Sequence, residues 1–205
     1  MAVRQMGEDK GGLAFADATA LARWLQTAGI SLEAWGQGAA KTVADLWREV
    51  MAGETTLSGD PPRREVQVAQ VFIRRDGRVL MEIEQEIADG RRRTRNWPPS
   101  EKFKRGEDAR LAARRCLAEE LGLAVSPDAL CEEGEFYTRE VDSPSYPGLL
   151  TLYRVHTVAL SAADLPTPGL PPDDFWRVNS AVNDPIRRHL WGWREERGQA
   201  LGARD

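Results

Sequence analysis

Cysteine and histidine are scarce in this chain, with two of each in 205 residues. Cys116 and Cys131 stand apart from each other, without the close spacing that metal-binding cysteines show. Two cysteines also cannot build the disulfide framework of a small secreted protein. We therefore expect a protein of the reducing cytoplasm.

Long apolar runs and an excess of either charge are also absent. No stretch approaches the roughly 20 apolar residues of a membrane-spanning helix, and the opening MAVRQMGEDKGG has no apolar signal segment. Lysine and arginine number 28 against 32 aspartates and glutamates, which gives a net charge of −4. We expect no membrane partner and no extended nucleic-acid surface.

The content of apolar residues, 41%, is high enough for a real hydrophobic core. Changes in composition and the Pro61-Pro62 pair suggest where the chain divides. The expected parts are a disordered tail at 1–11, a small helical N-terminal unit at 12–57, a linker at 58–63, a main domain at 64–195 and a tail at 196–205.

The N-terminal unit is predicted to hold two or three short helices, one of them a short turn that Ser31 would open in SLEAWG. Asp17 is suited to cap the first and Gly29 to end it, and the last follows in AAKTVADLWREVMAGE, with Gly53 as its stop. The unit contains tryptophans but no cluster of catalytic residue types. We interpret it as a helical cap, and exposed tryptophans there would suit a homodimer contact.

The main domain reads as alternating strands and helices, an α/β class. Asp76-Gly77 predicts a hairpin turn between two strands, and Ala88–Glu107 reads as a long irregular segment. Two further strands are expected at 131–139 and 149–160. A short strand and then a C-terminal helix are expected within Phe175–Trp193. The side chains of this helix that would pack inward are Ile186, Leu190 and Trp193.

The central helix of the domain lies within Gly106–Leu123. Ala109, Ala113, Leu117 and Leu121 recur every four residues and give it an apolar stripe. Off that stripe, helical spacing groups Cys116 with Glu119 and Glu120, and places Arg115 beside Glu119. Adjacent carboxylates suit a hard divalent cation. Without further context the same helix could simply carry solvated charges.

The same stretch resembles the signature of the Nudix hydrolases, which is Gly, five residues, Glu, seven residues, and Arg-Glu-apolar-any-Glu-Glu-any-Gly-apolar. Seven of the nine fixed positions match, and two depart, because Glu101 replaces the first Gly and Cys116 replaces the Glu after Arg. The matching residues are Glu107, Arg115, Leu117, Glu119, Glu120, Gly122 and Leu123.

The resemblance implies a Nudix-like α/β/α sandwich with a mixed sheet, preceded here by the small helical unit. It implies Mg²⁺ or Mn²⁺ as the cofactor, with Glu107, Glu119 and Glu120 as metal ligands and with Glu119, Glu120 and Arg115 in catalytic roles. The reaction it implies is attack of water on a diphosphate bond in a nucleoside diphosphate linked to another group. A general base often comes from outside the signature, and the candidates are Glu101, Glu133, Glu135, Glu140 and Asp142.

Basic residues precede the signature. Arg93 and Arg95 lie in the run Arg91–Arg95, and Lys102 follows where the family has a lysine. Guanidinium groups bind phosphate with two parallel hydrogen bonds, so Arg93 and Arg95 are predicted to bind a nucleotide-type substrate. The resemblance implies that Lys102 also reaches a phosphate. The alternative is a solvated loop.

Cys116 keeps a second function open. A thiol is a poor ligand for Mg²⁺, so its presence removes one hard ligand and one negative charge from the signature. The alternative function is a catalytically weak Nudix-like module that binds a nucleotide or an ADP-ribose-like ligand for sensing or regulation. A third is a structural protein that uses the fold as an interaction surface.

Overall fold

The computed structural model describes residues 12–38, 40–179 and 186–196. The chain divides into two compact units: unit 1 comprises residues 1–65 and 140–152, and unit 2 comprises 66–139 and 153–205. The expected tails at 1–11 and 196–205 lie outside the described residues, except for Glu196. The part of the chain that the structure describes has no helix long and apolar enough to cross a membrane.

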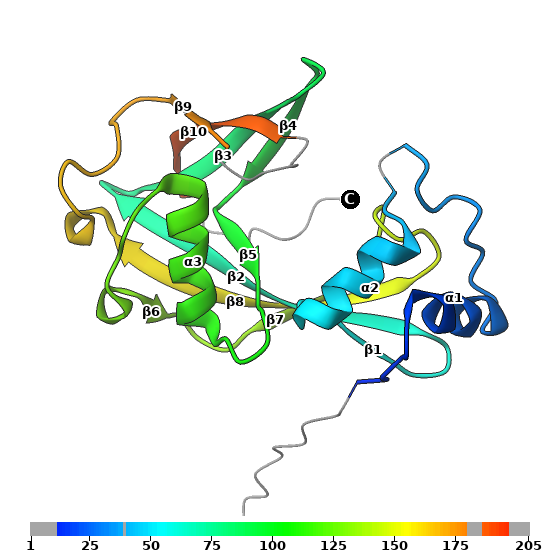
Figure 1. The fold of residues 1–205 in the computed structure, drawn as a ribbon. Helices are drawn as coiled ribbons and strands as arrows, with labels where there is room; N and C mark the ends of the chain where they lie inside the picture. Colours follow the sequence, from blue (N-terminus) through cyan, green and yellow to red (C-terminus); the bar gives the residue numbers. More distant parts are fainter. Residues whose placement is uncertain (1–11, 39, 180–185, 197–205) are drawn as a thin grey trace, which may run out of the picture. The chain divides into compact units, whose positions relative to one another are not determined.

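Unit 1 is built on two helices that lie side by side (Figure 1). They are α1 (Ala18–Thr27) and α2 (Val43–Ala52). Strand β1 (Thr56–Ser58) follows and pairs antiparallel with the first residues of β2 (Arg63–Arg75). Residues 59–62, within the expected linker, therefore form the turn of a hairpin inside this unit.

The core of unit 1 explains why it takes in residues 140–152. Tyr146 and Leu149 are fully buried with Leu21, Leu25 and Leu46 of the two helices, so apolar burial ties this distant segment to the N-terminal residues. The tryptophans are also turned inward. Trp35 is only 7% exposed, and Trp24 and Trp47 are partly buried against the same cluster. The homodimer stays a prediction.

The sequence correctly indicates where α1 begins and where α2 ends. The side chain of Asp17 accepts a hydrogen bond from the Ala20 amide at the start of α1, and Gly53 ends α2 in the left-handed conformation. Helix α2 begins with a capping box, in which the Asp45 amide donates to Thr42 Oγ1 (3.1 Å) and the Thr42 amide donates to Asp45 Oδ2 (2.8 Å).

Replacing Thr42 by Ala is expected to lower the free energy of unfolding by about 1 kcal/mol, because one cap is lost. Hydrogen bonds from Thr42 hold the pKa of Asp45 below its ordinary value. The stability that this lowered pKa contributes is fully present above the pKa of Asp45 in the unfolded state, about 3.9. It is lost as pH falls through the lower pKa of Asp45 in the folded state. The difference between wild type and variant in urea unfolding should therefore shrink in acid.

Thr27 offers the matched control, because its hydroxyl only donates to the Arg23 carbonyl within α1 (2.8 Å). Thr27→Ala should change the free energy of unfolding by less than Thr42→Ala at neutral pH. An equal loss in both variants would contradict the capping argument.

Unit 2 is organised around a mixed sheet in the order β6-β8-β2-β3-β10-β9, with β4 on β3, β5 on β2 and β7 on β8. This sheet with its helix confirms the predicted α/β class. The strands after β2 are β3 (Arg78–Ile87), β4 (Arg92–Trp97), β5 (Ser100–Lys102), β6 (Cys131–Glu132), β7 (Tyr137–Asp142), β8 (Leu150–Ser161), β9 (Phe175–Val178) and β10 (Ile186–Glu195). Two short 3-10 turns are η1 (Pro127–Ala129) and η2 (Ala162–Asp164).

Helix α3 (Ala109–Leu121) lies against one face of this sheet (Figure 1). Its predicted stripe is buried, and Leu117 packs in one cluster with Ile73 of β2 and Leu80 of β3. Burying a leucine side chain contributes roughly 1.5–3 kcal/mol. The cluster therefore fixes the position of α3 on the sheet, and with it the positions of its charged residues.

The segment Ala88–Glu107 is not irregular throughout, as the sequence suggested. It forms β4 and β5, and β4 pairs antiparallel with β3 so that Arg92 lies opposite Glu86 and Arg93 opposite Gln85. Opposite charges across two strands stabilise their pairing. The arginine run is the basic half of an acidic and basic hairpin.

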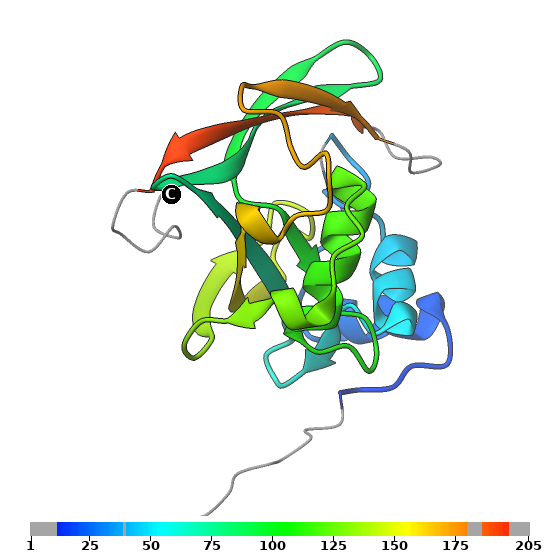
Figure 2. The same ribbon diagram turned by 90° about the vertical axis from the view of Figure 1, so that its left-hand side faces the viewer.

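The predicted C-terminal helix is wrong. Residues 186–195 form strand β10, which pairs with both β3 and β9 (Figure 2). The buried side chains of His189, Trp191 and Trp193 fall at every second residue, and between them lie the partly buried Leu190 and Gly192, which has no side chain. That period of two belongs to a strand, and tryptophan favours strands.

Candidate active site

Helix α3 is bounded by two residues with clear local roles. Asp108 accepts a hydrogen bond from the Leu111 amide (2.9 Å) and caps the start. Gly122 ends the helix with φ +59, and a Cβ there would meet the guanidinium of Arg177. Both the left-handed backbone and the close guanidinium explain why glycine occupies this signature position.

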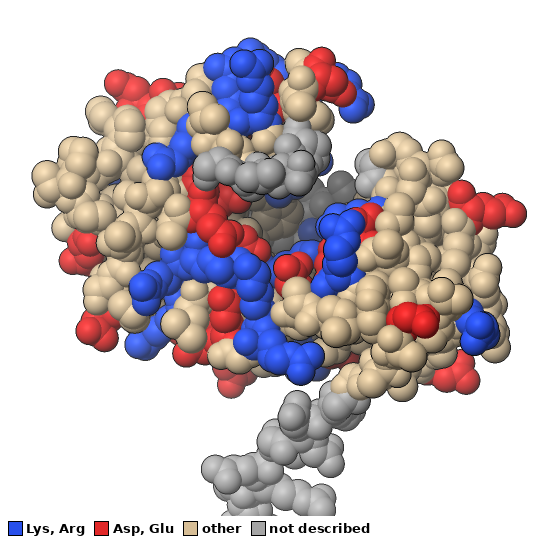
Figure 3. Space-filling view, viewed as in Figure 1, with Lys and Arg blue, Asp and Glu red and all other residues tan. Residues whose placement is uncertain are grey.

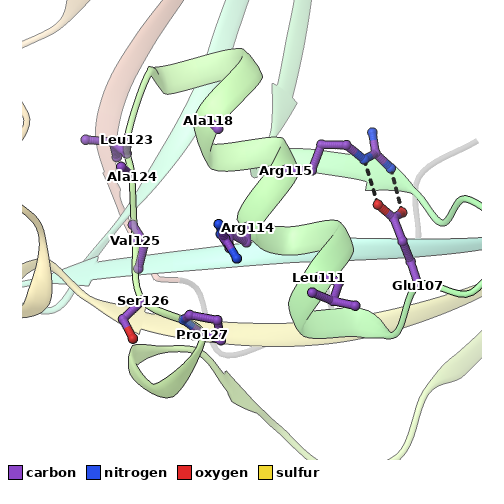
Figure 4. A pocket seen from close by; sticks show the side chains of 10 residues that line it. All are labelled: Glu107, Leu111, Arg114, Arg115, Ala118, Leu123, Ala124, Val125, Ser126 and Pro127. Carbon is purple, nitrogen blue, oxygen red and sulfur yellow. Dashed lines mark hydrogen bonds and ion pairs between the residues drawn. The ribbon is translucent and has the colours of Figure 1, made fainter.

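Arg115 is the centre of a carboxylate cluster beside α3. It binds Glu107 through two hydrogen bonds of 2.9 and 2.8 Å (Figure 4) and donates to the Lys102 carbonyl at 2.6 Å. Its Nη1 lies 3.3 Å from Glu101 Oε2 and 3.7 Å from Glu119 Oε2. The structure thus brings Glu101, Glu107 and Glu119 together around one guanidinium.

The carboxylate of Glu107 is committed to this cluster. Hydrogen bonds from Arg115 hold its pKa below the ordinary value, and its Oε2 also accepts from the Lys104 amide at 2.7 Å. Glu107 therefore holds Arg115 in this arrangement, and its role as a metal ligand stays a prediction.

Glu119 and Glu120 are the more accessible carboxylates, with side chains 54% and 29% exposed. Their oxygen atoms suit a hard divalent cation such as Mg²⁺ or Mn²⁺. Across residues 12–38, 40–179 and 186–196, no three His, Cys, Asp or Glu side chains already lie together as a complete set of metal ligands. The donor chemistry fits a cation, and binding one would require these side chains to close around it.

Cys116 does not lie in an open carboxylate cluster, as helical spacing suggested. Its side chain is fully buried in the core cluster with Ala112, Ala113 and Leu117. Burial, together with the charge of Glu120, raises the pKa of the thiol well above its usual value. A neutral, buried thiol acts as an apolar core residue and cannot replace the missing carboxylate.

His189 is the site residue that sequence reasoning missed. It is buried on β10, with Nδ1 2.5 Å from Glu82 Oε1 and Nε2 3.7 Å from Glu120 Oε2. The last glutamate of the signature therefore faces an imidazole from a distant strand. The only local signal was the two-residue period around His189, which identifies a strand but not its neighbours.

Glu82 on β3 is held from several sides. Gln85 Nε2 donates to its Oε1 at 2.5 Å, and Arg95 Nε donates to its Oε2 at 3.2 Å. Burial alone would raise the pKa of Glu82, but hydrogen bonds from His189 and Gln85 and the charge of Arg95 hold it below the ordinary value. Glu82 is therefore an anchored, ionised carboxylate.

The predicted substrate-binding residues lie around this network. Arg95 contacts Glu82, and Arg93 Nε donates to Gln85 Oε1 at 2.5 Å. Lys102 lies on β5, and its carbonyl accepts from Arg115. The structure thus brings Arg95 and Lys102 to the two sides of the site, but the guanidinium nitrogens of both arginines already contact protein groups.

The wider basic surface lies over β3, β4 and β10 (Figure 3). Glu86 sits within it and faces Arg188 at 2.6 Å, Arg92 at 3.4 Å and Arg187 at 3.9 Å. Trp176 has the guanidinium groups of Arg188 and Arg92 over its ring, at 4.3 and 5.3 Å. The arginines of this surface thus contact a carboxylate and an aromatic ring of the protein itself, and together these groups form a structural network.

Glu101 is the general-base candidate that the structure places beside α3. It lies on β5, near Arg115, and burial raises the pKa of its carboxyl. Among the other candidates, Glu133 pairs with Arg74 at 2.8 Å. Glu140 and Asp142 belong to unit 1, and Glu135 is exposed.

A cavity of about 590 Å³ borders α3, and Glu107 and Arg115 are part of its lining (Figure 4). Leu111, Arg114 and Ala118 of the helix and Val125 of the segment after it contribute to its lining. Glu120 follows Leu111 by roughly two and a half helical turns, so it points to the opposite side of α3. The cavity is therefore distinct from the region between Glu120 and His189.

No family model matches the chain, and no curated protein matches its sequence. Solved structures that it resembles include a NUDIX hydrolase from Nitrosomonas europaea, with 19% identity, TM-score 0.38, and coverage of 62% of this chain and 72% of that one. A C. elegans Ap4A hydrolase has 16% identity, TM-score 0.35, and coverage of 63% and 80%. A MutT NUDIX hydrolase from Burkholderia pseudomallei has 18% identity, TM-score 0.34, and coverage of 64% and 83%.

Unit 2 of this chain has a mixed sheet, and the helix that carries the stretch resembling the Nudix signature packs against it.

Proposed function

We propose that the chain is a Nudix-type hydrolase that cleaves a diphosphate bond in a nucleoside diphosphate linked to another group. The observation that carries the proposal is the Arg115 cluster, in which one guanidinium from α3 gathers Glu101, Glu107 and Glu119. Signature spacing alone would also occur on a solvated helix. A cluster ordered around the signature arginine supports a built site.

Each residue has a distinct role in this proposal. Glu119 and Glu120 would hold Mg²⁺ or Mn²⁺, which supplies charge neutralisation at the phosphate oxygens. Arg115, itself held by Glu107, positions Glu119 along the helix. Arg95 and Lys102 are proposed to bind phosphate groups of the substrate, as the sequence indicates, and Arg93 to support them through Gln85.

Glu101 is the proposed general base, and it would accept a proton from the attacking water. A carboxylate with a raised pKa is a better base than an ordinary glutamate at neutral pH. The raised pKa of Glu101 comes from its burial beside α3, and Arg115 keeps the side chain in place.

Replacing Glu101 by Gln is expected to lower kcat by about 10²–10⁴-fold, which is the usual contribution of a general base. The base works only when deprotonated, so wild-type turnover should fall as pH drops through the raised pKa. That acid limb should begin above the ordinary glutamate pKa of about 4.3, and the variant should lack it. Wild-type kcat in the variant would exclude Glu101 as the base.

A catalytically weak nucleotide-binding module is the second candidate, and the burial of Cys116 favours it. The signature position that should carry a carboxylate instead contributes to the core. The binding groups could then remain while catalysis is lost.

One assay separates the two functions. The full chain is incubated with Mg²⁺ or Mn²⁺ and a panel of nucleoside diphosphate compounds, and release of phosphate or nucleotide is measured. Turnover of at least one compound is expected. Saturable binding of a compound without turnover of any would replace the hydrolase with the binding module.

A further inference from the structure

We infer that His189 is a ligand of the cation held by Glu120, so that the site binds its metal through nitrogen as well as oxygen. This inference rests on the proposed function, since it concerns the same site. It adds a residue outside the signature, on strand β10, and predicts which cations the site prefers.

The distance between the two side chains fits a shared cation. His189 Nε2 and Glu120 Oε2 lie 3.7 Å apart. Two coordination bonds of about 2.1 Å span at most about 4.2 Å, so one cation can reach both atoms. The separation exceeds that of a hydrogen bond between these two atoms.

The other ring nitrogen is held as a metal-binding histidine requires. Metal-ligating histidines almost always donate their second N–H to a carboxylate or carbonyl, which fixes the tautomer and the ring. Here Nδ1 lies 2.5 Å from Glu82 Oε1. With the proton on Nδ1, the lone pair of Nε2 faces Glu120.

The supporting carboxylate is itself fixed. Gln85 and Arg95 hydrogen-bond the two oxygens of Glu82, and the Trp191 ring stacks on His189 with centroids 6.1 Å apart. His189 and Glu82 are both buried. Glu82 is therefore a positioning residue for His189, and the imidazole is oriented before a cation arrives.

The inference accounts for the loss at Cys116. Residue 116 lies one turn before Glu120 on α3, on the side that packs against the sheet. The carboxylate missing from that turn is replaced by an imidazole that comes from the sheet. Imidazole suits Zn²⁺ better than Mg²⁺, and affinity for nitrogen and oxygen sites rises from Mn²⁺ to Zn²⁺, so the site should bind Zn²⁺ more tightly than Mn²⁺.

Electron spin-echo spectroscopy of Mn²⁺ bound to the full chain tests the inference. The echo modulation from ¹⁴N reports a coordinated imidazole directly and requires no turnover. The chain has only two histidines, and His156 provides the matched control, because its Nε2 contacts Gln67 and its ring contacts Phe103. We expect ¹⁴N modulation in wild type and in His156→Gln, and its loss in His189→Gln.

Affinity provides a second measurement. His189→Gln should weaken Mn²⁺ binding by at least about tenfold, and Glu82→Gln by about 10–100-fold, the range for groups that orient a metal ligand. If His189→Gln does not fold, the comparison of wild type with His156→Gln still tests the inference. His189 is the remaining histidine in His156→Gln, so a ¹⁴N imidazole signal in that variant must come from His189. Any one of three results would overturn the inference: the wild-type chain does not bind Mn²⁺, it shows no ¹⁴N modulation, or the modulation is missing in His156→Gln.

The outcome is independent of the proposed reaction. Turnover with Mg²⁺ in a protein that shows no ¹⁴N modulation with Mn²⁺ would overturn the role of His189 and leave the hydrolase standing. Histidine modulation in a protein that turns over no compound would leave the metal ligand standing and remove the hydrolase.

Discussion

Replacing Glu120 by Gln is expected to lower kcat by at least about 10³-fold for any compound that the wild-type chain hydrolyses. Metal stabilisation of developing phosphate charge contributes several kcal/mol, and each 1.36 kcal/mol is tenfold in rate. The amide removes the negative charge that holds the cation but keeps the size of the side chain. Steady-state kinetics with Mn²⁺ and with Mg²⁺ would measure the loss.

The control for this variant is Glu195→Gln, on the same strand as His189 but exposed. It removes one carboxylate from unit 2 at a distance in sequence from the signature, and kcat should not change. Thermal unfolding of Glu120→Gln should stay close to that of wild type. Full activity in a folded Glu120→Gln would exclude this residue as a metal ligand.

Replacing Cys116 by Glu is expected to destabilise the metal-free chain by several kcal/mol. The side chain at this position is completely buried among alanines and leucines, and an ionised carboxylate pays a large desolvation penalty there. It would also lie near Glu120, whose charge already acts on the thiol. Urea unfolding without metal would measure the loss.

Added metal should reverse part of that loss. A third carboxylate one turn before Glu120 would strengthen binding of Mg²⁺, and a ligand that binds only the folded state raises stability as its concentration exceeds Kd. Cys131→Glu is the matched control, since Cys131 is exposed and such changes usually stay within about 0.5 kcal/mol. Equal Mg²⁺ stabilisation of Cys116→Glu and wild type would show that position 116 does not reach the cation.

Local signals in the sequence predicted the helices and one hairpin well. Asp17 and Gly53 bound the N-terminal helices as expected, and Gly122 ends α3. Asp76 and Gly77 both have positive φ, 49 and 71, as a tight hairpin turn requires. These features depend on residues within one turn of each other, so the sequence contains the relevant information.

The strands that were missed depend on partners far along the chain. Strand β10 is placed by β3 and β9, and His189 lies 107 residues from Glu82. The four arginines among residues 91–95 suggest a loop in the sequence, because the carboxylates of β3 that lie opposite this strand are distant along the chain. Pairing of this kind is tertiary and overrides local propensity.

Cys116 shows the same limit at the scale of one helix. Spacing correctly grouped it with Glu120, but it did not show that this side of α3 faces the sheet. The direction of the helix face is decided by the packing of Leu117 and its neighbours in the core. The spacing of the signature was therefore predictable, whereas the surroundings of each member were not.

The two-segment composition of unit 1 limits how this protein can be shortened. Tyr146 and Leu149 are fully buried there, although they lie in sequence between two strands of the sheet. A truncated chain beginning at residue 66 would keep the whole signature but leave these side chains without their apolar partners. We therefore expect such a truncation to destabilise the segment 140–152, which packs on the N-terminal helices.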